Sequence, residues 1–288
     1  MRILAPALLA AALVLTGCGD DDVAAPSPVP TTPVSSPSAS APATPAASPS
    51  SAAGTAARAV YWLGAGDEPR GPRLYREFVA RPADADPVCD AVELMLAGEP
   101  ADPDYTSLWA DGTTLLDVTT EGSTAVVDLS QQATTNGGGS AFEAFTLQQL
   151  VHTVTAADPS LTEVRLLVEG EPVETLWGAT DASGPLRRDQ AATTLGPVWL
   201  DVPEGGTIDG AFGGSATVFE ATVSWALRQG DRVVQEGFST ATIGAPERGE
   251  WTAEADVPPG DYVLWAYESS ARDGSITWLD TKSVTVAG

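Results

Sequence analysis

The sequence is poor in the residues that most often bind metals or act as general bases. Its 288 residues include two cysteines and one histidine. A zinc site of the usual Cys/His kinds needs about four such ligands, so one copy of this chain cannot assemble one. The single histidine, His152, is also the only side chain whose ordinary pKa suits a general base near neutral pH. The composition therefore excludes the familiar zinc sites and leaves little for histidine-based catalysis.

Basic residues are scarce as well. The chain carries 14 lysines and arginines against 39 aspartates and glutamates, which gives a formal net charge of -25 at pH 7. Nucleic acids and anionic lipid surfaces would repel so acidic a protein, so we expect neither as its main partner. The charge favours solubility and is compatible with basic partners or loosely held cations.

The N-terminal apolar run is too short to span a membrane stably. Residues 1–18 have one positive charge, a short apolar core and the ending Leu15-Thr16-Gly17-Cys18, which together are typical of a secretory signal. The ending resembles a bacterial lipobox, whose cysteine is diacylated and becomes the mature N-terminus. We therefore predict a lipoprotein signal peptide with a palmitate-type anchor on Cys18. The alternatives are an ordinary signal peptide with a coincidental cysteine and an uncleaved anchor.

Residues 19–57 lack the composition of a folded domain. From Val23 to Ala57 there is no charged residue, and proline recurs among Ala, Ser and Thr. Such a segment buries too little apolar surface to offset its ordering entropy, and proline favours extended conformations. We predict a disordered tether that reaches on the order of 100 Å at ~3 Å per residue.

The first helix of the folded part is predicted over residues 84–97. Asp86 can cap its start, Pro87 suits its first turn and Gly98 can close it. Apolar residues of one face recur at helical spacing, namely Val88, Val92, Met95 and Leu96. Alternating or β-branched runs predict strands around it, over residues 59–63, 73–81, 113–120 and 123–129.

A second helix is predicted from Ser140 to the Asp158-Pro159 pair, since proline disfavours helix in the residue before it. Ser140 and Glu143 have the spacing of a capping box, in which each side chain satisfies a backbone N–H of the first turn. One buried face is predicted from the i, i+3, i+4, i+7 spacing of Leu147, Leu150, Val151 and Val154. The alternating run at 164–168 predicts a strand after it.

Several of these segments resemble the sporulation and spore-germination (GerMN) domain. The resemblance covers roughly residues 58–190, and its main segments are AVYWL at 59–63, LMLAGEP at 94–100, VDLS at 127–130 and LQQLVHTV at 147–154. It implies an envelope domain whose fold is similar to ring-building motifs of secretion-type assemblies, without enzymatic activity. The strand and helix order predicts an α+β fold, with two helices on one face of a small sheet.

Residues 196–287 predict a second domain that is all β. Short strand-like runs alternate with turn signals, as in a β-sandwich, at residues 198–202, 216–227, 232–243, 250–255, 262–268 and 276–286. The segments 214–221, 260–262 and 268–275 resemble the immunoglobulin-like domain of bacterial spore-germination proteins. No Cys-Trp-Cys framework is present, so the core is expected to use aromatic and aliphatic side chains, with Phe219, Trp225, Trp251 and Trp265 as its aromatic members.

The candidate chemical groups each have a structural interpretation that we favour. His152 falls beside the apolar stripe of its helix, which indicates a surface or boundary position rather than a catalytic base. Ser140 caps a helix and lies in no hydrolase elbow. Cys89 lies beside the apolar face of its helix and, with Cys18 acylated, is expected to be a buried inert thiol, with a reactive or intermolecular thiol as the alternative. We predict no catalytic, metal-binding or cofactor-binding residue.

Two further groups of residues have both a functional and a structural interpretation. The acidic groups at 20–22, 84 and 86, and 102 and 104 lack the register of a calcium loop, so solvated surface is the favoured interpretation. A glycan-stacking platform and a buried core are the two alternatives for the tryptophans of the second domain, with the core favoured for Trp225, Trp251, Trp265 and Trp278.

The sequence thus predicts a non-catalytic lipoprotein anchored to the outer face of the cytoplasmic membrane. Its expected role is protein binding or scaffolding, linked to sporulation, germination or envelope assembly. Expected partners are the membrane through Cys18, envelope proteins and, as an alternative, peptidoglycan; nucleic acid is excluded. The alternative functions are a cell-wall glycan-binding lipoprotein and, as a second alternative, an envelope enzyme.

Overall fold

A computed structural model describes residues 54–64 and 71–288. The predicted signal peptide, the lipidation site Cys18, the acidic residues 20–22 and nearly all of the predicted tether lie outside these residues. Within the described part, no helix is long and apolar enough to cross a membrane.

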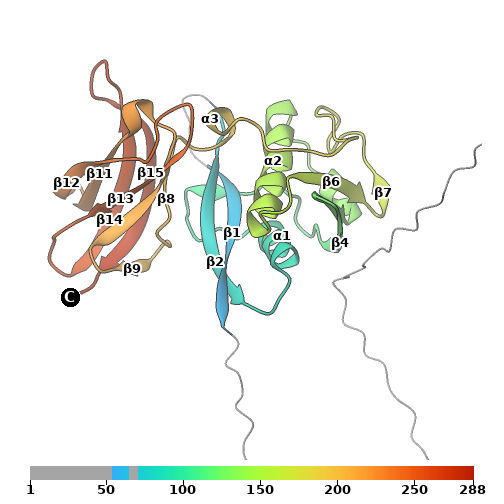
Figure 1. Cartoon of the computed structure of the whole chain (residues 1–288), viewed down its shortest axis with the longest axis horizontal. Coiled ribbons are helices and arrows are strands. Elements are labelled where there is room, and N and C mark those ends of the chain that lie inside the picture. Colours follow the sequence, from blue (N-terminus) through green and yellow to red (C-terminus); the bar gives the residue numbers. More distant parts are fainter. Residues whose placement is uncertain (1–53, 65–70) are drawn as a thin grey trace, which may run out of the picture.

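The first domain contains two sheets and two main helices (Figure 1). One sheet has the order β2-β1-β3 and consists of β1 (Thr55–Gly64), β2 (Leu74–Pro82) and β3 (Tyr105–Thr106). The other has the order β4-β5-β6-β7 and consists of β4 (Leu115–Glu121), β5 (Thr124–Leu129), β6 (Glu163–Val168) and β7 (Glu171–Pro172). The helices are α1 (Pro87–Ala97), the 3-10 helix η1 (Gln131–Thr134) and α2 (Ser140–Ala157). The predicted α+β class is confirmed.

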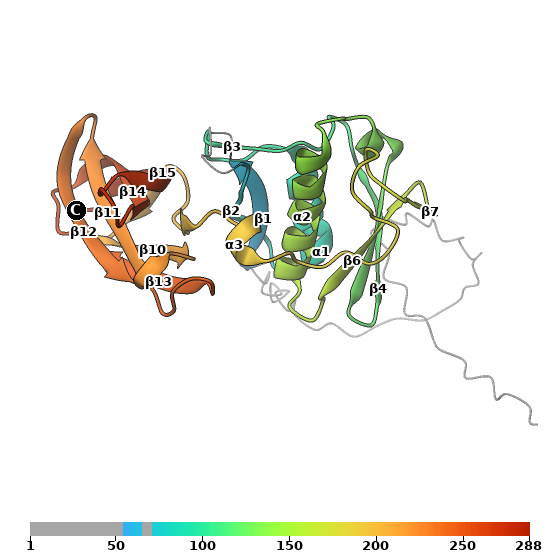
Figure 2. The same ribbon diagram turned by 90° about the horizontal axis from the view of Figure 1, so that it is seen from above.

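The helices lie between the two sheets rather than on one face of a single sheet (Figure 2). Both helices contact β1 and each other, while α1 also contacts β4 and α2 contacts β6. The parallel pair β5 and β6 is joined through α2, as a parallel crossover requires. The predicted strands are therefore present but divide between two sheets, and β1 begins at Thr55, three residues before the predicted boundary at residue 58.

Because it lies between two sheets, α2 is buried on most of its surface. The four predicted apolar residues are buried, and so are polar ones: Thr146, Gln148, Gln149, His152, Thr153 and Thr155. The segment that follows β7 crosses the helix and satisfies some of these groups. The Gln148 amide donates to the Arg187 carbonyl at 2.9 Å and accepts from the Asp189 N–H at 3.0 Å.

The two helix starts differ in how well local sequence predicts them. At α1 the Asp86 carboxylate accepts from the backbone N–H groups of Val88 and Cys89, both at 2.9 Å, as predicted. At α2 the predicted capping box is wrong, since Gly139 precedes the helix and no side chain caps it. Glu143 is instead fully buried and accepts from the N–H groups of Trp177 and Ala179, both at 2.8 Å. The buried Glu143 carboxylate thereby gains partners outside its own helix, as a buried charge requires.

The second domain is a sandwich of a three-stranded and a five-stranded sheet, as predicted. The sheet orders are β13-β10-β8 and β12-β11-β14-β15-β9. A short helix, α3 (Ala191–Thr194), precedes the strands, which are β8 (Val198–Leu200), β9 (Gly206–Ile208), β10 (Ala211–Ala216), β11 (Thr222–Gln229), β12 (Arg232–Thr240), β13 (Gly249–Glu254), β14 (Gly260–Ser269) and β15 (Ile276–Val286). Trp225 and Trp251 pack edge-on against Phe212, with ring centroids 5.2 and 6.3 Å apart.

The run 216–227, predicted as one strand, is interrupted. β10 ends at Ala216, a 3-10 turn η2 (Phe219–Ala221) follows, and β11 begins at Thr222. Glu220 and Ala221 have φ angles of 52° and 56°, a conformation that non-glycine residues rarely adopt. The turn carries the chain from one sheet to the other. It leaves Phe219 67% exposed, so its predicted place in the core is wrong.

A substitution at Gly214 tests how closely β8 and β10 must approach each other. It pairs with Leu200 across the strands, and a Cβ at this position would overlap the carbonyl oxygen of Trp199. We expect Gly214→Ala to lower the free energy of unfolding by about 2 kcal/mol or more, because the strands must separate. Urea unfolding followed by tryptophan fluorescence measures this. Gly184→Ala is the control, since a Cβ there meets no atom within 4 Å; equal effects of the two changes would contradict the prediction.

Candidate functional site

The two domains meet along β2, β3 and residues 101–105 on one side and β8 and β15 on the other (Figure 1). Lys282 on β15 lies at the centre of this junction and is 1% exposed. Its ammonium forms an ion pair with Asp102 and lies 3.9 Å from a Glu77 carboxylate oxygen. Glu77 in turn accepts from the N–H groups of Ala101 and Asp102 at 3.1 and 2.9 Å. The charged groups are thus stabilised by one another and by backbone N–H groups.

Asp280 completes the buried charge cluster. Its carboxylate accepts from the Tyr105 hydroxyl at 2.8 Å and from the Leu200 N–H at 2.7 Å. Burial raises the pKa of Asp280 to about 7, and burial followed by the charges of Asp280 and Asp102 raises the pKa of the Tyr105 hydroxyl well above its usual value. Three carboxylates surround one lysine, so retaining a proton on Asp280 limits the excess of buried negative charge.

Trp199 joins the two hydrophobic cores. It lies on β8 of the second domain but packs with the buried residues of the first, edge-on to Tyr61 with ring centroids 6.2 Å apart. The Arg248 guanidinium lies 3.4 Å from the centroid of its indole, and Arg76 lies at 5.3 Å. Arg76 also forms a bidentate pair with Asp201 at 2.7 and 3.1 Å. These contacts join the domains through packing as well as through charge.

The predicted surface position of Asp102 and Asp104 is wrong in part. Asp102 is buried in the junction, and the exposed Asp104 accepts from the Thr281 hydroxyl at 2.9 Å. Asp84 and Asp86 are exposed, as expected. No group of three or more potential ligands for a metal ion occurs in residues 54–64 and 71–288.

His152 is buried rather than at the surface, with 2% exposed. Its ring lies 5.1 Å from that of Tyr61, and in the described chain neither ring nitrogen has a hydrogen-bond partner. Burial first, then the nearby charges of Arg188 and Arg248, lowers its pKa to about 3. The surface prediction fails because a second sheet and the crossing segment cover α2. The imidazole is therefore neutral near pH 7.

The structure also shows where the other candidate residues from the sequence lie. Ser140 is exposed at the first residue of α2. Cys89 is buried, as expected, but it is not a free cysteine, so the expectation of a free thiol is wrong. Three of the four tryptophans of the possible glycan platform are buried: Trp225, Trp251 and Trp278. The fourth, Trp265, is partly exposed, and the Arg228 guanidinium lies 4.3 Å from its ring centroid.

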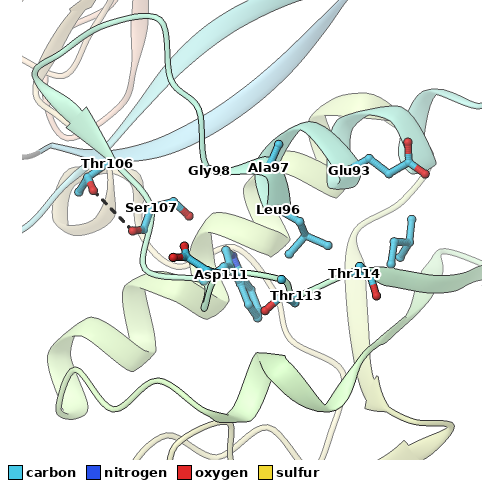
Figure 3. A pocket seen from close by; sticks show the side chains of 12 residues that line it. Glu93, Leu96, Ala97, Gly98, Thr106, Ser107, Asp111, Thr113 and Thr114 are labelled. Carbon is cyan, nitrogen blue, oxygen red and sulfur yellow. Dashed lines mark hydrogen bonds between the residues drawn. The ribbon is translucent and has the colours of Figure 1, made fainter.

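A hollow of about 700 Å³ opens on the first domain, beside the end of α1 (Figure 3). Glu93, Leu96 and Ala97 line it from α1, and Trp109 and Asp111 line it from the loop between β3 and β4. Sequence reasoning missed it, although Trp109 stands out as an aromatic residue in a polar loop. The hollow offers carboxylates and hydroxyls, which suit binding by ion pairs and hydrogen bonds.

The pKa of Asp280 predicts a pH dependence of stability. Its folded-state pKa lies near 7, above the usual value near 4 of an unfolded chain, so its contribution is greatest at low pH and is lost as pH rises from about 4 to about 7. The loss is on the order of a few kcal/mol. Asp280→Asn should remove this slope in urea unfolding measured from pH 4 to 8.

The exposed Asp231→Asn is the control, and its pH profile should run parallel to that of the unchanged chain. A constant difference in the free energy of unfolding between the chain and Asp280→Asn at every pH would contradict the assignment.

Comparison with known proteins supports the two-domain description. Residues 59–174 match the family model described as sporulation and spore germination, and residues 200–275 match the immunoglobulin-like domain of bacterial spore germination. A comparison with curated proteins finds no match.

Among solved structures, a candidate lipoprotein from Clostridium perfringens is 22% identical, with 46% of this chain and 88% of that chain covered and a TM-score of 0.34. The first GerMN domain of the sporulation protein GerM from Bacillus subtilis is 20% identical, with 46% and 98% covered and a TM-score of 0.39. The tandem GerMN domains of GerM are 15% identical, with 51% and 48% covered and a TM-score of 0.39. The matches to the two family models show that the chain carries a sporulation and spore-germination domain followed by an immunoglobulin-like domain of bacterial spore germination.

Proposed function

We propose that this protein is a non-catalytic lipoprotein that binds or scaffolds other proteins at the outer face of the cytoplasmic membrane. The predicted lipid on Cys18 anchors it, and the proline-rich segment that precedes β1 holds the folded part away from the membrane. Both domain families are named for sporulation or germination, and neither is named for an enzyme activity. The process it serves is a sporulation, germination or related envelope assembly.

The buried junction around Lys282 is the observation that carries this proposal. Separation of the domains would remove the contacts of Lys282, Asp102 and Asp280 across the junction or would expose these residues to water. A charge that stays buried without a partner lowers the free energy of unfolding. The two domains therefore act as one rigid unit. A rigid unit presents surfaces at a constant spacing, which reduces the entropy lost when a partner binds.

Exposed sheet edges offer a physical route for such binding. β4 and β12 are edge strands of their sheets, and each has unpaired backbone groups along one side. Phe238 on β12 is 75% exposed and pairs across the strands with Ser224. Ser224 and Phe219 help to line a second hollow, which is distinct from the one beside α1. An extended segment of another protein can add to such an edge, where the backbone supplies affinity and side chains supply specificity.

The glycan-binding alternative has less support. It depends on the long tether and on a platform of four tryptophans, of which Trp225, Trp251 and Trp278 are buried. Arg228 stacks on the ring of Trp265 and competes for the face that a sugar would use. The enzyme alternative relied on His152, whose ring nitrogens are buried.

The lipid anchor predicts a simple labelling result. Cells that express the chain and are fed radiolabelled palmitate should incorporate label into it, and Cys18→Ala should abolish incorporation, because the diacylated thiol is then absent. Gel autoradiography measures the label. Retention of full labelling in Cys18→Ala would exclude this anchor, and a Ser27→Ala change is a control that should leave labelling intact.

The scaffolding role predicts a specific envelope partner. After cross-linking of intact membranes, affinity purification of the full chain should recover at least one envelope protein that is absent when the chain is not expressed. Lys282→Met leaves the buried carboxylates unpaired and should reduce recovery several-fold, since it loosens the junction.

Arg81→Met is the matched control, because it removes a cation that is exposed near the end of β2. It should leave recovery unchanged, and circular dichroism verifies that both variants are folded. Recovery of no protein above the background of cells without the chain would refute the proposed function.

A further inference from the structure

We propose that the side chains of Lys282 and Asp102 condense to an amide, a covalent bond that joins the two domains within one chain. This modification goes beyond the binding role proposed above. Lys282 lies on β15 of the second domain, and Asp102 lies in the loop between α1 and β3 of the first. The two residues are 180 positions apart in the sequence, so the bond closes a large loop of the chain.

The amine at this position is unique in the chain. Lys282 is the only lysine among the 14 lysines and arginines of the sequence. Arginine supplies the cation in the other ion pairs of the described residues. An arginine stays protonated in proteins, whereas a buried lysine readily loses its proton and then acts as a nucleophile. The single side-chain amine of the protein therefore lies where its chemistry differs most from that of arginine.

The two reacting groups are in direct contact and are shielded from water. The Lys282 Nζ pairs with the Asp102 Oδ2, and each side chain is 1% exposed. An aromatic wall covers the pair, since Nζ lies 4.0 Å from the ring centroid of Tyr105, and Tyr75 stacks on that ring with centroids 5.1 Å apart. Well-oriented groups of one molecule react as if present at about 10⁵–10⁸ M. Contact and exclusion of water thus favour condensation over hydrolysis.

The reaction requires an uncharged amine and a protonated acid. Burial disfavours the charged form of each group, and transfer of one proton from Nζ to Oδ2 removes both charges at once. Burial raises the pKa of Asp102 above its ordinary value, although the charge and hydrogen bond of Lys282 oppose the rise. The neutral pair forms within the contact that the structure shows, without movement of either domain.

The neighbouring groups suit each step of the condensation. Nζ attacks Cγ of Asp102, and the negative charge develops on Oδ1, which accepts from the Asp104 N–H at 2.8 Å. The Glu77 carboxylate has an oxygen 3.9 Å from Nζ, and it takes the proton that the amine loses and returns it to the leaving Oδ2. The C–N bond forms, the bond from Cγ to Oδ2 breaks, and one water leaves. No oxidant, reductant or other reactant is consumed.

The product suits a buried junction. The amide replaces a buried ammonium and a buried carboxylate by one N–H and one carbonyl, and so it removes two charges. Glu77 keeps its two backbone N–H donors. Asp280 keeps the Tyr105 hydroxyl and the Leu200 N–H. The other carboxyl groups of the junction therefore retain hydrogen-bond partners after the bond forms.

Mass spectrometry of the full chain tests the bond. The chain, purified in detergent, reduced and denatured, should weigh one water less than its sequence and attached lipid together. Trypsin cleaves after an unmodified lysine, so the linked chain should instead yield a branched peptide in which residues 273–288 are joined to residues 77–165. Full recovery of the linear peptides 273–282 and 283–288, with no loss of water, would show an ion pair only and overturn the proposal.

Variants at the reacting groups assign the lost water. Asp102→Ala and Lys282→Met each remove one partner, so each chain should have the full mass of its own sequence. The exposed Asp84→Asn is the matched control and should keep the branched peptide. A loss of water that persists in either junction variant would place the dehydration at another residue and overturn the assignment. The digest of the unchanged chain decides the proposal even if a variant does not fold.

A variant at Glu77 tests the proton transfer. Glu77→Gln keeps the shape of the side chain and removes the proton acceptor. At equal times after synthesis, its linked fraction should be several-fold lower than that of the unchanged chain, with the same circular dichroism. Glu121→Gln, on the exposed end of β4, is the control and should be linked as fast as the unchanged chain. Equal linking in Glu77→Gln would overturn the role of this carboxylate.

Discussion

The ion pair of Lys282 with Asp102 is the constraint on which the two-domain arrangement depends. A buried lysine is tolerated only with a partner, and its partner comes from the other domain. Asp280, also on β15, adds a second such contact, since its carboxylate accepts from the Tyr105 hydroxyl of the first domain and from the Leu200 N–H. Each domain therefore supplies groups that the other needs, and Trp199 extends this dependence to the packing of the first core.

The placement of α2 between two sheets has a similar effect within the first domain. A helix covered on several sides must bury polar residues, and each of these needs a partner. The crossing segment supplies several partners, through the carbonyl of Arg187 and the N–H of Asp189. His152 is an exception, because its ring nitrogens have no partner in the described chain and burial keeps the ring neutral. The only histidine thus contributes to packing against Tyr61.

The distribution of charge connects the structure with the proposed function. In the junction, buried acidic groups are paired or protonated, so they stabilise the rigid unit. In the hollow beside α1, Glu93 and Asp111 are unpaired and accessible. A chain with a net charge of -25 attracts basic partners over its whole surface.

The sequence by itself determined the features that depend on neighbouring residues. These include the Asp86 cap with Pro87 at the start of α1, the end of α2 before Pro159, the hairpin turn at Gly122 and the order of most strands. Only the tertiary structure decided which strands share a sheet, that Glu143 serves the segment at 177–179 instead of its own helix, and that Asp102 meets Lys282, 180 positions away. Local backbone preferences are encoded over a few residues, whereas burial and charge pairing depend on which elements come together in space.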